Sequence, residues 1–330
     1  MNKKWRRLAI VSVIVSAASL LIISLLGLNY KALENIGKIN LFFLACAFGF
    51  HFLSLFFWGI RIKTMAGILN ERISLRRSLH IVLVNVFVGA ITPSQIGGEP
   101  TRIKMLTEEG LSSGGATGLV VSERIVDFIF LMSFAPIIFF LAGREFTISS
   151  FAPILYGGFI LLIILLAFFI FVVAKREKGT QMLCNIVKIF VKKRDKRDKI
   201  CKKIEKEMRN FSDTMKNMLW KKSNFFKIIL PTAALWICDM IVPSIILLAL
   251  GQNPYWLFSL AVQFLIMIAT MLPLTPGGSG IAEFGSFILY AQVLPIGVVS
   301  VLTILWRITL FYTNLIVGFV FTFLYLRRKL

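Results

Sequence analysis

The sequence is poor in acidic residues, cysteine and histidine. Its 330 residues include 16 aspartates and glutamates against 37 lysines and arginines, with four cysteines and two histidines. The cysteines, at positions 46, 184, 201 and 238, form no C-x-x-C pair, so neither a disulfide framework nor a metal site is predicted. The sequence also lacks a G-x-x-x-x-G-K-[ST] phosphate-binding loop, and we expect no cofactor and no ATP-driven step.

Long apolar runs dominate what the sequence does contain. Hydrophobic residues make up 57% of the chain, against roughly half in a soluble domain, and the mean hydropathy is +0.82. Runs longer than about 18 residues favour membrane-spanning helices over a β-barrel, because a backbone in lipid must satisfy its own hydrogen bonds. We therefore predict an all-α, polytopic integral membrane protein. Its apolar segments are 8–28, 39–60, 79–92, 118–142, 151–174, 226–250, 254–272, 281–294 and 296–326.

Two of these segments are short and border stretches rich in glycine and proline. They are 79–92 and 281–294. The glycine and proline residues beside them predict broken or re-entrant helices. The expected architecture is about seven full spans plus two re-entrant or broken-helix hairpins. The first run, 8–28, is too long for the apolar region of a signal peptide and is predicted to be an uncleaved span.

Lysine and arginine gather on one side of the apolar segments. The ranges 1–7, 61–77, 102–109, 175–227 and 327–329 hold 32 of the 37. By the positive-inside rule these loops and both termini are cytoplasmic, in a multi-pass protein of the cell membrane. The net charge of +21 thus follows from topology, and because no nucleic-acid-binding module accompanies it, nucleic acid is not an expected partner.

The most basic segment, 192–222, also has an apolar stripe. Its apolar residues recur every three or four positions, which predicts an amphipathic helix. Such a helix could lie on the anionic inner leaflet, cover the protein's own cytoplasmic face, or recruit a cytosolic partner. The residues of the stripe are Ile200, Ile204, Met208, Phe211, Met215 and Met218.

A repeated motif relates the first and second halves of the sequence. Residues 92–100 and 275–283 align at an offset of 183, and in each half an arginine follows the Thr-Pro proline by 31 residues. The two units enter the membrane from opposite sides, which predicts an inverted repeat within one domain, 1–330. Its halves, about 1–174 and 226–326, flank a cytoplasmic segment, about 175–225. The equivalent pairs are Thr92 and Thr275, Pro93 and Pro276, Gly97 and Gly280, Arg124 and Arg307, and Ile125 and Ile308.

The two repeated arginines lie inside apolar segments, where a charge costs at least ~2.5 kcal/mol. Both should face the protein interior. Arg124 has Asp127 one helical turn away as an ion-pair partner, whereas Arg307 has no acidic residue within four positions. The partner of Arg307 is therefore a bound ligand or one of three acidic residues, Glu283, Glu99 and Asp239.

A phosphate suits such a site. A planar guanidinium pairs with phosphate through two hydrogen bonds, and the N-termini of broken helices attract anions in many transporters. These features favour a phospholipid or lipid-linked phosphate headgroup as the ligand. The alternative is structural, namely two kinked helices packed through glycine.

Three motifs, in this order, resemble the lysylphosphatidylglycerol synthase transmembrane family, also called flippase-like. They are TPSQIGGEPTR at 92–102, SERIVD at 122–127 and TPGGSGIAE at 275–283, and the resemblance spans about residues 8–326. It implies a membrane domain that, in two-part members, translocates aminoacylated phosphatidylglycerol. The chain ends soon after its last apolar segment, so we expect no synthase domain. The residues that carry the resemblance are Gly97, Gly98, Glu99, Arg102, Glu123, Arg124, Asp127, Pro276, Gly277, Gly278, Gly280 and Glu283.

These residues, with Arg307 and Asp239, form the predicted substrate site, and no catalytic residue is predicted. The leading hypothesis is translocation of a phospholipid or other phosphate-bearing lipid through a cleft between the inverted halves. One alternative is a headgroup transferase resembling phosphatidylglycerol lysyltransferase, with Glu99 or Glu283 as general base, although no nucleophile accompanies them. The other is a membrane scaffold without transport activity. Oligomeric state is left open.

Overall fold

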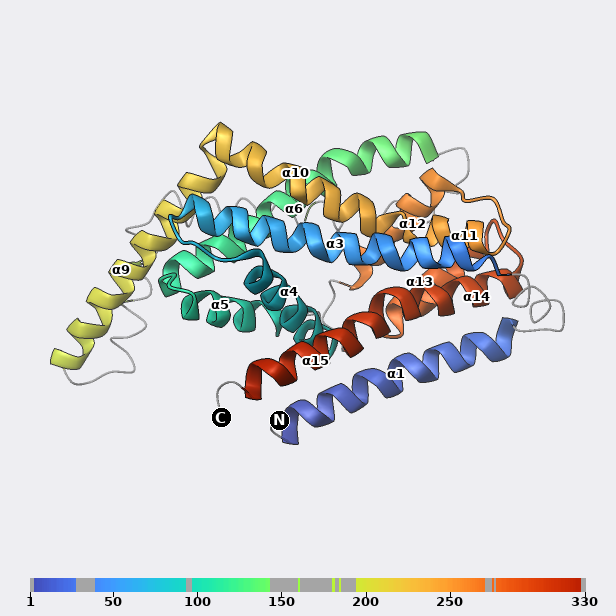
Figure 1. Cartoon of the computed structure of the whole chain (residues 1–330), viewed down its shortest axis with the longest axis horizontal. Helices are drawn as coiled ribbons and strands as arrows, with labels where there is room; N and C mark the ends of the chain where they lie inside the picture. The colour runs from blue at the N-terminus through green and yellow to red at the C-terminus, as the bar shows by residue number, and fades with distance from the viewer. Residues whose placement is uncertain are drawn as a thin grey trace.

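A computed structural model describes residues 3–27, 39–92, 97–142, 160, 180–181, 184, 194–270, 275 and 277–327. Helices make up most of this part of the chain, and it contains no strand (Figure 1). The elements are α1 (Lys3–Gly27), α3 (Leu41–Ile68), α4 (Leu75–Ala90), α5 (Gly98–Glu108), α6 (Ser113–Ala142), α9 (Arg194–Leu219), α10 (Lys222–Met240), α11 (Val242–Ala249), α12 (Trp256–Thr270), α13 (Ile281–Tyr290), α14 (Ile296–Arg307), the π-helix η2 (Ile308–Tyr312) and α15 (Thr313–Arg327).

Several helices are long and apolar enough to cross a membrane. Among the described residues these are α3, the continuous pair α10 and α11, and the run of α14, η2 and α15, with mean hydropathies of 2.0, 2.0 and 1.7. Large apolar side chains such as Leu25, Leu41 and Phe42 point outward, as lipid-facing residues do. The predicted all-α membrane fold is confirmed. The number of full spans stays a prediction, because the segment 151–174 lies outside the described residues apart from Ile160.

Both glycine-rich motifs fall between two short helices. In the first half α4 ends at Ala90 and α5 begins at Gly98, and in the second half α12 ends at Thr270 and α13 begins at Ile281. The helices predicted to be broken are therefore interrupted at both motifs. Positive φ angles at Gly277 and two further glycines before α13 require residues without a side chain.

The two helix breaks contact each other directly. The backbone N–H of Gly277 donates a hydrogen bond of 3.0 Å to the carbonyl oxygen of Thr92. A Cβ atom on Gly277 would lie only 2.5 Å from the carbonyl oxygen of Ala90. Glycine at this position therefore permits the close approach of two segments that are far apart in the sequence.

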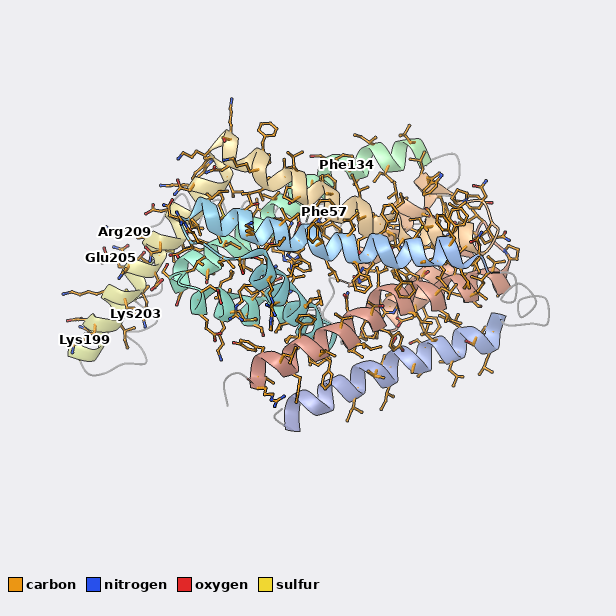
Figure 2. The ribbon with its side chains drawn as sticks, viewed as in Figure 1. Phe57, Phe134, Lys199, Lys203, Glu205 and Arg209 are labelled. Atoms are coloured by element: carbon orange, nitrogen blue, oxygen red, sulfur yellow. The ribbon has the colours of Figure 1, made fainter. Side chains whose placement is uncertain are left out.

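Helix α9 is the amphipathic helix predicted from the basic segment. Its second half packs on α6, where Glu207 accepts a hydrogen bond of 2.6 Å from the Gly114 N–H, and Met215 and Met218 are buried. Its first half, which carries Lys199 and Lys203, extends beyond the bundle (Figure 2). The helix thus covers part of the protein's own surface with its second half.

The first residue of α1, the last residue of α15 and helix α9 all lie toward one end of the molecule (Figure 1). This arrangement agrees with the expectation that the basic segment and both termini share one side of the membrane. That this side is the cytoplasm stays a prediction from the distribution of lysine and arginine.

Candidate functional site

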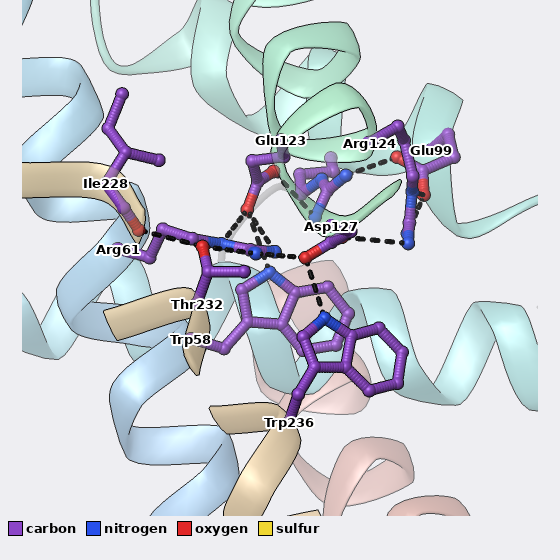
Figure 3. A network of polar contacts seen from close by, with 10 residues as sticks. Trp58, Arg61, Glu99, Glu123, Arg124, Asp127, Ile228, Thr232 and Trp236 are labelled. Atoms are coloured by element: carbon purple, nitrogen blue, oxygen red, sulfur yellow. Dashed lines mark hydrogen bonds and ion pairs between the residues drawn. The ribbon is translucent and has the colours of Figure 1, made fainter. Parts of the chain in front are cut away.

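Three arginines and three carboxylates from different helices form one network, called here the arginine–carboxylate cluster (Figure 3). Arg61 comes from α3, Glu99 and Arg102 come from α5, and the other three residues come from α6. Its positive and negative charges are equal in number. The six members are Arg61, Glu99, Arg102, Glu123, Arg124 and Asp127.

Arg61 lies deep in the cluster and is only 1% exposed. Its Nε donates to Glu123 Oε1 at 2.9 Å, its Nη1 contacts Asp127 and Thr232, and Trp58 Nε1 donates to the same Glu123 oxygen at 3.0 Å. The sequence analysis placed Arg61 in a cytoplasmic loop. That placement is wrong, because α3 continues to Ile68 and carries Arg61 on its buried face.

The remaining arginines share the carboxylates of α5 and α6. Arg102 is fully buried between Glu99 and Glu123 Oε2, the latter at 2.9 Å. Arg124 contacts Glu99 through two nitrogens, with Nε at 2.9 Å, and reaches Asp127 at 3.5 Å. The ion pair predicted within α6 is therefore present, but Glu99 on α5 is the closer partner of Arg124.

Arg307 is held at the second glycine motif. Its Nε lies 2.9 Å from Glu283 Oε1, its Nη2 donates to Ser279 Oγ at 3.2 Å, and its guanidinium lies 4.1 Å from the centre of the Phe311 ring. Of the candidate acidic partners, the structure thus selects Glu283. Glu283 Oε2 also accepts the N–H of Gly280 at 2.6 Å, so this carboxylate neutralises the positive end of α13.

A π-helix follows Arg307 directly. Element η2 (Ile308–Tyr312) shifts the register of the long C-terminal span and places Phe311 against the Arg307 guanidinium. Helix α1 adds Ser16, whose hydroxyl donates to Glu283 Oε1 at 2.7 Å and lies 3.3 Å from the Tyr312 hydroxyl. Single π-turns of this kind recur at functional sites, where they redirect side chains.

Both repeated arginines face a single cavity of about 270 Å³. Its wall takes residues from α3, α4, α5, α6, α10, α12, α13, α14, η2 and α15, together with Gly277 from the second break. Six of the predicted site residues line it: Glu99, Arg124, Asp127, Asp239, Gly277 and Arg307. The cavity therefore takes its wall from both halves of the sequence, next to the point where the two helix breaks meet.

The other predicted site residues that the structure describes do not line the cavity. Arg102, Glu123 and Glu283 lie behind its wall and hold the side chains that do. Gly98 lies so close to α4 that a Cβ there would be 2.6 Å from Asn85 Oδ1. The glycines Gly97, Gly278 and Gly280 likewise shape the helix breaks, and Pro276 is outside the described residues.

Another polar group on the cavity wall was not predicted as part of the site. His51 lies in the apolar segment 39–60 and is 1% exposed. Its Nδ1 lies 2.9 Å from Asp239 Oδ1 and its Nε2 lies 3.0 Å from Asn314 Oδ1. All three residues line the cavity. No local pattern marks His51, since its partners are on distant helices.

Fold and site together define a multi-pass helical membrane protein with a charged cavity between broken helices. The chain belongs to the family described as "Lysylphosphatidylglycerol synthase TM region", whose family model matches residues 8–318. It is 34% identical over 266 residues to a UPF0104 membrane protein of Archaeoglobus fulgidus, covering 79% of this chain and 80% of that relative.

Two further relatives are also UPF0104 membrane proteins. The protein from Methanothermobacter thermautotrophicus is 28% identical over 304 residues, covering 88% of this chain and 86% of the relative. The protein from Pyrococcus horikoshii is 25% identical over 265 residues, covering 77% of this chain and 78% of the relative. No solved structure matches the chain.

Proposed function

We propose that this protein translocates a phospholipid, or another phosphate-bearing lipid, across the cell membrane by passing the headgroup through the central cavity. One observation carries the proposal: Arg124 and Arg307, from the first and second halves of the sequence, line the same cavity where the two helix breaks meet. A guanidinium binds phosphate oxygens through parallel hydrogen bonds. A phosphate entering this cavity thus meets two such groups.

The size of the cavity fits a headgroup better than a whole lipid. Its volume of about 270 Å³ is near the lower end of the ~300–1,000 Å³ typical of small-molecule sites. Acyl chains would stay in the bilayer, next to the apolar outer surface of the helices. This division of the lipid between a polar cavity and the hydrocarbon phase is what transfer of a headgroup between leaflets requires.

The exposure of the arginines suggests an order of events. The side chain of Arg124 is 49% exposed, whereas that of Arg307 is 7% exposed and is paired with Glu283. A phosphate can therefore reach Arg124 first, and must then compete with Glu283 for Arg307. Competition of this kind keeps binding reversible, because each arginine regains a carboxylate when the phosphate leaves.

The alternative of a headgroup transferase has less support from the geometry. Glu99 and Glu283, the expected general bases, are each engaged by an arginine. A carboxylate whose oxygens are occupied by a guanidinium is not positioned to take a proton from a headgroup. In the same ion pairs, a phosphate can replace the carboxylate as the partner of the arginine. This exchange favours translocation.

A liposome assay tests the proposal. The full chain is reconstituted into vesicles that contain a fluorescent phosphatidylglycerol, and a membrane-impermeant quencher reports how fast the inner-leaflet probe becomes accessible. We expect exchange above that of protein-free vesicles. In Arg307→Gln vesicles whose protein is verified to be folded, we expect a loss of about tenfold or more, equivalent to removal of ~1.4 kcal/mol of binding.

Arg209→Gln is the matched control, because it removes an arginine that is exposed on α9 and distant from the cavity. It should exchange lipid at the wild-type rate. Folded protein that shows no exchange with phosphatidylglycerol, phosphatidylethanolamine or cardiolipin would contradict the proposal.

A further inference from the structure

The charged groups around the cavity do not balance completely. The arginine–carboxylate cluster is neutral, and Arg307 is neutralised by Glu283. Asp239 is the additional carboxylate, and within the described part of the chain its ion-pair partner is His51. When the ion-paired residues directly behind the wall are counted with those that line it, the charges sum to −1 with His51 neutral and cancel with His51 protonated.

The hydrogen-bond geometry around His51 accommodates both protonation states. Both ring nitrogens face oxygens, Asp239 Oδ1 at 2.9 Å and Asn314 Oδ1 at 3.0 Å. A protonated imidazole donates from both nitrogens and fits this arrangement. A neutral ring that donates to Asp239 needs a donor at Nε2, which Asn314 supplies by rotating its amide group through half a turn.

Around the His51–Asp239 pair, the other charged groups that line the cavity are held in ion pairs, so the His51 proton is the charge that can change. The side chain of Asp239 is 29% exposed and lines the cavity, so protons and water reach the pair from there. Helices α4 and α11 add no charged residue to the described wall. The other charged groups that line the cavity are Arg61 of α3, Glu99 of α5, Arg124 and Asp127 of α6, and Arg307 of α14, all held in the ion pairs described above.

We infer that His51, Asp239 and Asn314 form a protonation site that takes up one proton when a phosphate-bearing headgroup occupies the cavity. The inference rests on the proposed function and assigns it a proton coupling. A phosphate adds negative charge next to Asp239, a carboxylate whose ion-pair partner is a histidine and not an arginine. A proton bound at His51 Nε2, donating to Asn314 Oδ1, offsets that charge, and histidine is the side chain that changes charge between about pH 5 and 8.

The proton site can be observed without any transport assay. The chain has two histidines, and His80 on α4 does not line the cavity. In a His80→Gln variant with isotope-labelled histidine, reconstituted as the full chain in lipid nanodiscs, His51 gives the histidine signal in a nuclear magnetic resonance titration. We expect His51 to gain a proton between about pH 8 and pH 5, and Asp239→Asn to move the midpoint down by about one pH unit or more.

A His51 ring that stays neutral over this range, or a midpoint that Asp239→Asn does not move, overturns the inference. Asn314→Asp provides an independent check, because a second carboxylate at Nε2 should stabilise the protonated ring and move the midpoint to higher pH. A downward or absent shift in Asn314→Asp also contradicts the proposed geometry. This titration needs only a folded His80→Gln protein. Folding is verified when the unfolding temperature of the variant equals that of the wild type.

Lipid exchange then shows whether the proton is coupled to transport. We expect wild-type vesicles to exchange fluorescent phosphatidylglycerol about fivefold faster near pH 5.5 than near pH 8, a ratio that falls below about two in His51→Gln. His80→Gln should keep the wild-type ratio. Exchange that is present but equal at both pH values refutes the coupling and leaves the proposed function standing. Exchange that is absent at every pH refutes the proposed function, and the titration still decides whether the proton site exists.

Discussion

At the scale of single residues, Arg307 and Glu283 form a buried ion pair whose partners depend on each other. Both are almost fully buried, and the pair has a nitrogen–oxygen distance of 2.9 Å. Removing one partner leaves an uncompensated charge, so Arg307→Gln should lower the free energy of unfolding by about 3–5 kcal/mol. Adding Glu283→Gln to that variant should recover part of the loss. Denaturant unfolding in detergent micelles measures both.

The exposed pair of Arg209 and Glu205 on α9 is the reference for this experiment. Its atoms are 3.8 Å apart and both side chains are more than half exposed. Arg209→Gln should therefore change the free energy of unfolding by less than about 1 kcal/mol. If Arg307→Gln were as mild as Arg209→Gln, the ion pair at the second glycine motif would not be a stabilising contact.

The sequence predicts the interior position of some of these arginines but not of others, and the difference has a physical reason. Arg124 and Arg307 interrupt apolar runs, and an isolated charge in such a run predicts an interior role. Arg61 lies at the end of its run, two residues before Lys63, where a basic side chain usually extends to the membrane surface. Its carboxylate partners come from α6, far along the sequence, so only the side-chain contacts of the folded protein identify it.

At the scale of elements, the contact between the two helix breaks should depend on Gly277. An alanine there would meet the Ala90 carbonyl oxygen at 2.5 Å and would also need to adopt a φ of 60°. Gly251 has a similar φ of 67°, but a Cβ added there would have no neighbouring atom within 4 Å. We therefore expect Gly277→Ala to destabilise the protein by about 1–3 kcal/mol more than Gly251→Ala, a difference that isolates the contact from backbone strain.

Unfolding temperatures of the two variants provide the measurement. Equal losses would mean that the second break can move away from α4 at no cost, and that the meeting of the breaks does not position the cavity. A larger loss in Gly277→Ala would support the close contact seen between Gly277 and Thr92.

The packing of α9 on α6 is a second property of elements that can be tested. A Cβ on Gly114 would lie 2.0 Å from the Glu207 carbonyl oxygen, so Gly114→Ala should push α9 away from α6. Hydrogen exchange in the second half of α9 should then be faster than in the wild type. Gly67→Ala on α3, where no atom lies within 4 Å, is the control and should leave α9 protected. Unchanged protection in Gly114→Ala would contradict the close packing.

The sequence predicts these elements better than it predicts their contacts. The two breaks follow from glycine and proline, whose effects on the backbone are local. The segment 79–92 accordingly corresponds to α4, which ends at Ala90, and the start of the segment 281–294 coincides with the start of α13. The hydrogen bond between Gly277 and Thr92 joins residues on different broken helices, and no local pattern encodes it.

At the scale of the whole molecule, residues related by the common sequence offset of 183 lie close together in the structure. Residues related by that offset, Arg124 and Arg307, line the same cavity, and the motifs that precede them touch. An inverted repeat with two related halves explains this arrangement, and it stays a prediction. If a phosphate binds between Arg124 and Arg307 as proposed, both halves hold it together, and neither arginine alone accounts for binding.

Binding by both arginines together predicts how lipid affects the stability of the protein. A ligand that binds only the folded state, at about 100 times its dissociation constant, stabilises that state by ~2.7 kcal/mol. Phosphatidylglycerol should raise the unfolding temperature of the wild type in detergent, whereas diacylglycerol, which lacks the phosphate, should not. Arg124→Gln/Arg307→Gln should lose this response. Arg197→Gln/Arg209→Gln removes the same charge from α9 and should keep it. Equal stabilisation by both lipids would show that acyl chains, and not the phosphate, bind the protein.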